Sequence, residues 1–194
     1  MVLHYVNEEH EDNVYWSTKE GDFSQWTDKK FTLGLPFPNL PYYIDGDLKL
    51  TQSEAILRHL GRKYKLYGAN DQDYSVVDML IDTSHDLKIA LAMIAYNPDF
   101  DKLKANHIKD VEPKFKQVSE FLGSKKFLMG DNLTIADFTM RDAIQWHLAL
   151  DKNLISSNLQ AYVSRLESEP KLKSFLNSSK AYKTFFNPIA IWMG

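Results

Sequence analysis

The hydrophobic positions in the second half of the chain recur at helical spacing over long stretches. This pattern predicts a helix over residues 76–95, which should end before Pro98 because the residue preceding a proline avoids the α region. A second helical stretch follows as far as Gly123, and a bend or a restart is expected near Pro113. Further helices are predicted at residues 134–150, 158–168 and 170–177.

Two of the predicted helix starts carry the capping-box pattern, in which a Ser or Thr is followed three residues later by an acidic side chain. Thr134 and Asp137 form one such pair, ahead of the helix over residues 134–150. Thr51 and Glu54 form the other, so we expect a helix to begin at Thr51.

The first 67 residues have a different character, with short segments punctuated by proline and glycine. Two extended runs at residues 42–44 and 48–50 flank Asp45-Gly46-Asp47, which predicts a β-hairpin. Residues 13–16 are predicted as a short strand, and residues 23–31 as a polar loop with a turn of helix. We therefore expect an α+β domain over residues 1–67, followed by an all-α domain over residues 68–194.

The composition agrees with a globular protein and excludes several classes of function. The 194 residues are 44% hydrophobic and 25% charged, and the net charge is −3. An acidic balance gives no basic face for nucleic acid or anionic membrane. No apolar run is long enough to span a bilayer, and the acidic N-terminal segment does not resemble a signal peptide, so we expect a cytoplasmic location.

The residue types also limit the chemistry. The absence of cysteine excludes disulfides and thiolate catalysis, and no phosphate-binding glycine loop is present. The group most similar to a metal site is Asp82, His85 and Asp86, but no second cluster supplies further ligands. We expect a solvated helix face there and no metal.

The segment from Phe37 to Ser53 carries the most specific signal. Leu40-Pro41 is a candidate cis bond at the entry to a strand, where the Leu40 backbone could pair with an extended peptide. Gln52 and Ser53 lie at a predicted helix N-terminus, where free amides favour an anion. These features suggest a small acidic peptide as ligand, and a turn followed by an ordinary helix cap is the alternative that the residues leave open.

Longer segments resemble the mu class of cytosolic glutathione transferases. They are KFTLGLPFPNLPYYIDGDLKLTQS from Lys30 to Ser53, AILRHLGRKY from Ala55, AYNPDF from Ala95 and GDNLTIADF from Gly130. The resemblance covers about residues 3–194. It implies a thioredoxin-like N-terminal domain, an all-helical C-terminal domain, a homodimer, and conjugation of glutathione to hydrophobic electrophiles, with glutathione as co-substrate and no other cofactor.

The resemblance also implies roles for individual residues. The positions that match the glutathione site are Trp26, Lys30, Asn39, Leu40, Gln52, Ser53 and, from the partner subunit, Asp86. Tyr96 matches a tyrosine of the electrophile pocket, and Phe37 matches an aromatic side chain that inserts into the partner subunit. Lys88 matches a position that often lines the electrophile pocket.

One departure from the family leaves the catalytic residue unknown. The family begins with a strand and helix that carry Gly-Tyr-Trp, whose tyrosine hydroxyl favours the thiolate of glutathione. About twenty such residues have no counterpart here, so the N-terminal domain is expected to be truncated. Tyr15 matches the second strand instead. The alternatives are a catalytically impaired binding or structural protein, and a fragment of a normal enzyme.

Overall fold

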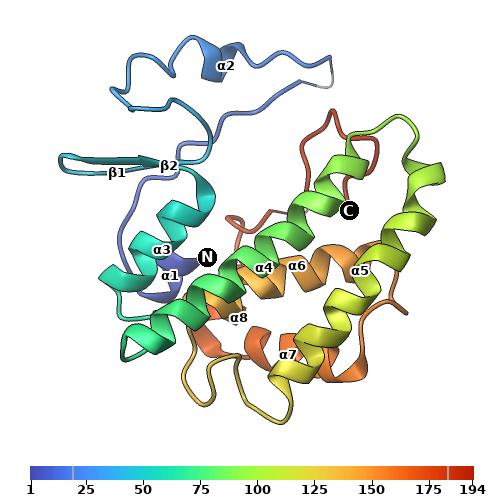
Figure 1. The fold of residues 1–194 in the computed structure, drawn as a ribbon. Helices are drawn as coiled ribbons and strands as arrows, with labels where there is room; N and C mark the ends of the chain where they lie inside the picture. Colours follow the sequence, from blue (N-terminus) through green and yellow to red (C-terminus); the bar gives the residue numbers. More distant parts are fainter. Residues whose placement is uncertain (19, 183) are drawn as a thin grey trace.

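The structure is a computed structural model that describes residues 1–18, 20–182 and 184–194. A small N-terminal unit lies against a bundle of longer helices (Figure 1). The helices and strands are α1 (Val2–Tyr5), α2 (Ser24–Thr27), β1 (Tyr42–Asp45), β2 (Leu48–Thr51), α3 (Ser53–Lys63), α4 (Asp71–Ala95), α5 (Phe100–Leu122), α6 (Ile135–Leu150), α7 (Ser157–Glu167) and α8 (Pro170–Leu176).

The predicted hairpin is confirmed. Strands β1 and β2 pair antiparallel, with Tyr42 opposite Thr51 and Asp45 opposite Leu48. Gly46 adopts φ 57°, a left-handed conformation that suits glycine in a tight turn. The register places residues 40–41 and 52–53 at the same end of the hairpin, so the two candidate binding segments are neighbours.

The strand predicted over residues 13–16 is wrong, because this segment has no strand partner in the described residues. It is extended chain whose Tyr15 ring packs on other aromatic rings. The one turn of helix expected within residues 23–31 is present as α2. The first residues form the short helix α1, and Val2 is buried in the core.

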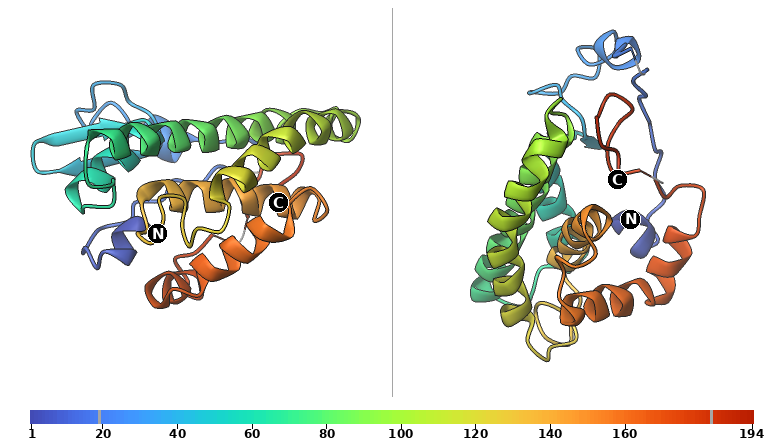
Figure 2. Two further views of the ribbon diagram at one scale, coloured as in Figure 1. Left: turned by 60° about the horizontal axis from the view of Figure 1, so that its bottom comes forward. Right: turned by 90° about the vertical axis from the view of Figure 1, so that its right-hand side faces the viewer.

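Helix α4 crosses the molecule and packs along α6 and α5, while α7 packs on α6, and α8 packs on α7 and α1 (Figure 2). The restart predicted near Pro113 is wrong, since α5 continues through that residue. Proline has no N–H, so the Lys109 carbonyl lacks its usual hydrogen-bond donor in the helix. Lys109 and Pro113 are both exposed, so water can satisfy that carbonyl.

One hydrophobic core joins the two halves. Ile56 and Leu60 of α3 are buried together with Leu80 and Leu87 of α4 and with residues of α5, α6 and α7. The short α3 therefore gains its stability from burial against the helical half rather than from its own length. The division into domains at residue 67 stays a prediction.

The capping box at the start of α6 is confirmed. The Thr134 amide donates to the Asp137 carboxylate at 2.8 Å, and Asp137 is completely buried. The same carboxylate accepts the Leu128 amide at 2.9 Å and the Tyr162 hydroxyl at 2.8 Å. This side chain therefore joins the loop before α6 to α7.

The capping box predicted at Thr51 and Glu54 is wrong. Thr51 is the last residue of β2, and α3 begins only at Ser53. The ladder with Tyr42 holds Thr51 in the extended conformation, which removes it from the cap position. Glu54 instead pairs with His85 of α4.

Among the described residues, no helix has the combination of length and apolar character needed to cross a membrane.

Candidate functional site

The first part of the candidate site is the chain that enters β1. The Leu40–Pro41 peptide bond is cis, as predicted. Leu40 is 38% exposed, and its amide donates to the Asn39 side-chain oxygen at 2.9 Å. A peptide that paired with the Leu40 amide would therefore first displace the Asn39 carboxamide, an exposed contact between adjacent residues.

Three aromatic rings pack behind this edge. Trp26 stacks on Tyr42 with ring centroids 5.9 Å apart, and Tyr15 lies 5.4 Å from Trp26. The hydroxyls of Tyr15 and Tyr42 form a 3.0 Å hydrogen bond. Burial and this bond raise the pKa of Tyr42 to about 12. The Tyr15 hydroxyl is thus already bonded to Tyr42, which does not favour Tyr15 as the group that stabilises a thiolate.

The packing also limits how far a ligand can contact the two residues expected at the glycyl end of glutathione. Trp26 is only 8% exposed, so little of this residue is available to a ligand. Lys30 is half-buried, and its ammonium lies 4.9 Å from the centre of the Phe31 ring. A carboxylate could compete for this ammonium, since a cation–π contact at the surface is weak.

The second part of the site is the amino end of α3, directly beside Leu40 through the hairpin register. Gln52 is exposed and adopts φ 73°, a left-handed conformation that is uncommon for residues other than glycine. This conformation turns the chain from β2 into α3. The first amides of the 11-residue helix and the Ser53 hydroxyl are the donors expected to meet an acidic group.

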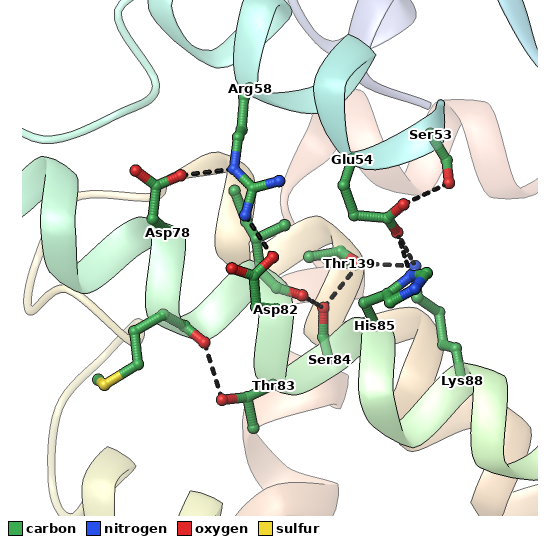
Figure 3. A network of polar contacts seen from close by, with 12 residues as sticks. Ser53, Glu54, Arg58, Asp78, Asp82, Thr83, Ser84, His85, Lys88 and Thr139 are labelled. Carbon is green, nitrogen blue, oxygen red and sulfur yellow. Dashed lines mark hydrogen bonds and ion pairs between the residues drawn. The ribbon is translucent and has the colours of Figure 1, made fainter. Parts of the chain in front are cut away.

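A polar network joins this end of α3 to α4 and α6 (Figure 3). Arg58 bonds Asp78 at 2.5 Å and also pairs with Asp82. Glu54 pairs with His85 of α4 at 2.8 Å. Asp82 and His85, two of the three residues of the metal-like group, therefore face different partners.

Asp86, which is expected to reach the glutathione of the partner subunit, lies on α4 and is exposed. No cluster of three or more potential ligands suited to a metal ion occurs in the described parts of the chain.

Lys88 lies in the contact between α4 and α6. Its ammonium donates to the Thr139 hydroxyl at 2.8 Å, and its side chain is 15% exposed. The Thr139 hydroxyl also bonds Ser84 at 2.9 Å, inside the contact between α4 and α6. Lys88 thus belongs to the polar network between the helices.

An aromatic cluster lies at the far end of α4, where Tyr96 follows the helix. Tyr96 is 39% exposed and meets the edge of Phe186 at 5.7 Å. Trp192 stacks on Phe100 at 5.8 Å, and its amide donates to the Ala95 carbonyl at 3.1 Å. These contacts hold the C-terminal segment beside Tyr96, so the Tyr96 ring lies in apolar surroundings.

Phe37 is 77% exposed, the most exposed aromatic side chain of the described residues. Exposing so large an apolar side chain to water is unfavourable, and burial against a partner surface would remove this free-energy cost.

Sequence reasoning missed Glu54 and His85 as members of the candidate site. The spacing of Glu54 from Thr51 suggested a cap, and no local pattern relates residue 54 to residue 85.

Comparisons with known proteins place the chain in one family. The family model for the glutathione S-transferase N-terminal domain matches residues 2–62, and the model for the C-terminal domain of the same family matches residues 85–179. The chain belongs to the glutathione S-transferase family, with its thioredoxin-like N-terminal domain and helical C-terminal domain.

The relatives specify the class within that family. Glutathione S-transferase Mu 1 of Bos taurus is 39% identical over 99% of this chain and 90% of its own length. Glutathione S-transferase Mu 1 of Homo sapiens is 36% identical over the same shares. The solved structure of the glutathione S-transferase Blo t 8 has a TM-score of 0.87 and 27% identity, and covers 97% of this chain and 90% of that one. The resemblance to the mu class is confirmed.

Proposed function

We propose that this chain binds reduced glutathione and conjugates it to apolar electrophiles, with the glutathione sulfur forming the new bond to the electrophile. The observation that carries this proposal is the hairpin register. It places the Leu40 backbone and the amino end of α3 side by side, in a chain that matches mu-class relatives along almost its whole length. An extended tripeptide could pair with Leu40 and direct its γ-glutamyl carboxylate to Ser53.

The remaining residue roles are part of the same proposal. Trp26 and Lys30 hold the glycyl end, Asn39 and Gln52 contact the peptide, and Tyr96 borders the electrophile. The aromatic surroundings of Tyr96 favour flat, apolar electrophiles. Binding the two reactants next to each other supplies proximity, which is a large part of the rate enhancement in such reactions.

A homodimer completes the proposed site. Asp86 lies on α4 and is exposed to solvent, and we assign it to the glutathione of a second subunit. Phe37 is the proposed contact that inserts into that subunit. We also propose a cytoplasmic location, separate domains over residues 1–67 and 68–194, and no cofactor besides glutathione as co-substrate.

A second candidate is a binding protein that retains glutathione but conjugates little. The hydrogen bond between Tyr15 and Tyr42 favours it, because it leaves the described chain without an assigned hydroxyl for the sulfur. The two candidates agree on binding and differ on turnover. Measuring both properties on the same preparation therefore separates them.

The test combines calorimetric titration with glutathione and a spectrophotometric assay with glutathione and an activated aryl chloride. Binding together with turnover above the uncatalysed rate supports the transferase, while binding without turnover supports the second candidate. Absence of binding contradicts both. Gln52→Ala should raise the KM for glutathione about tenfold, since the loss of one hydrogen bond to a charged group is worth about 1.5 kcal/mol.

The matched control is Gln72→Ala. Gln72 is also exposed but lies in the first turn of α4, outside the proposed site. Its replacement should leave the KM for glutathione unchanged. Equal effects of the two substitutions would contradict the placement of the γ-glutamyl end at Gln52.

A further inference from the structure

Glu54 lies in the first turn of α3, where the γ-glutamyl carboxylate of glutathione is proposed to bind. The Ser53 hydroxyl donates to one carboxylate oxygen of Glu54 at 2.6 Å. The other oxygen lies 2.8 Å from His85 Nδ1 and 3.7 Å from the ammonium of Lys88. Figure 3 shows Glu54 between Ser53 on one side and the two basic side chains of α4 on the other.

The Glu54 side chain is enclosed and ionised. Only 14% of it is exposed. Burial alone would raise the pKa of Glu54, but the hydrogen bonds from Ser53 and His85 and the charge of Lys88 hold that pKa below its ordinary value. A carboxylate of the protein itself therefore stands at the amino end of α3 at neutral pH.

This arrangement affects the Ser53 hydroxyl, which carries a single proton to donate. While that proton is bonded to Glu54, it cannot be donated to an incoming carboxylate. The negative charge of Glu54 would also repel a second carboxylate at the same helix end. We propose that Glu54 is a specificity-determining residue that competes with the α-carboxylate of the γ-glutamyl unit for Ser53 and the amino end of α3, an inference that rests on the proposed function.

His85 and Lys88 determine where Glu54 goes when the ligand enters. Both are on α4, and Lys88 is held in place by its bond to Thr139 at 2.8 Å. They offer Glu54 the imidazole of His85 and the ammonium of Lys88 as partners on the side away from Ser53. Glutathione binding thus transfers the Ser53 bond from Glu54 to the ligand, while Glu54 keeps its contacts with α4.

The test measures the dissociation constants of three peptides for the wild type and for Glu54→Gln. The peptides are glutathione, glutaryl-Cys-Gly, which lacks the amino group, and 4-aminobutyryl-Cys-Gly, which lacks the α-carboxylate. Glu54→Gln removes the competing charge and should tighten glutathione and glutaryl-Cys-Gly about fivefold or more. It should leave 4-aminobutyryl-Cys-Gly unchanged, since that peptide brings no carboxylate to Ser53.

The opposite pattern would overturn the inference. If Glu54 recognised the γ-glutamyl ammonium, Glu54→Gln would weaken glutathione and 4-aminobutyryl-Cys-Gly and spare glutaryl-Cys-Gly. Equal changes for all three peptides would indicate a merely structural role and would also overturn it. A wild type that binds none of the peptides contradicts the proposed function itself, which separates the two failures.

Two further variants accompany this test. Lys88→Met removes a cation that draws Glu54 toward α4, so it should weaken glutathione binding, in the direction opposite to Glu54→Gln. This keeps the inference testable if Glu54→Gln does not fold. Asp45→Asn is the matched control, because Asp45 bonds Lys63 and Tyr43 at the far end of the hairpin and should not alter any of the three constants.

Discussion

Replacement of Asp137 by alanine should destabilise the chain strongly. The buried carboxylate accepts bonds from the amides of Leu128 and Thr134 and from the hydroxyls of Thr134 and Tyr162. Alanine would leave four buried donors without a partner. Bonds to a charged group are worth about 1.5–3 kcal/mol each, but the wild type also bears the cost of burying the carboxylate. We therefore expect a net loss of about 3–5 kcal/mol.

This loss would be measured as the free energy of unfolding in urea and as the melting temperature. A chain of 194 residues should melt about 2–4 °C lower for each kcal/mol lost, so the shift should be about 6–20 °C. Thr134→Ala removes only part of the capping box and should cost about 1 kcal/mol. Asp131→Ala is the matched control, because Asp131 is exposed in the same loop. If Asp137→Ala cost no more than Asp131→Ala, the network would not contribute to stability.

Three other predictions address pH, catalysis and assembly. Burial lowers the pKa of His147 from 6.5 to about 4, so as the pH falls the unfolded chain takes up the proton before the folded chain does. The contribution of His147 to the free energy of unfolding should be complete above about pH 6.5 and should decrease by up to about 3 kcal/mol as the pH falls to 4. His147→Gln should flatten this dependence of the urea midpoint on pH, and an unchanged slope would contradict the assignment. Tyr15→Phe should leave kcat within about twofold, whereas a fall of about a hundredfold would make Tyr15 catalytic. Phe37→Asp should shift the mass measured by light scattering from dimer to monomer, and an unaltered dimer would exclude Phe37 as the contact.

The sequence by itself determined the elements whose signals are local. The Asp-Gly turn between two extended runs predicted the hairpin, and the Thr134–Asp137 spacing predicted the start of α6, because both depend on residues that are neighbours along the chain. Motif resemblance placed the candidate glutathione residues at matching positions. The family comparisons then confirmed the class.

Only the tertiary structure decided the partners of side chains that come from different elements. Glu54 fits a capping pattern with Thr51, but pairing with Tyr42 keeps Thr51 in β2 and leaves Glu54 to meet His85. Residues 13–16 have the composition of a strand, yet a strand forms only where a neighbour offers its backbone groups. Lys88 could have faced a pocket or the helix interface, and its bond to Thr139 on α6 assigns it to the interface. Such contacts join residues far apart in the chain, so no local spacing encodes them.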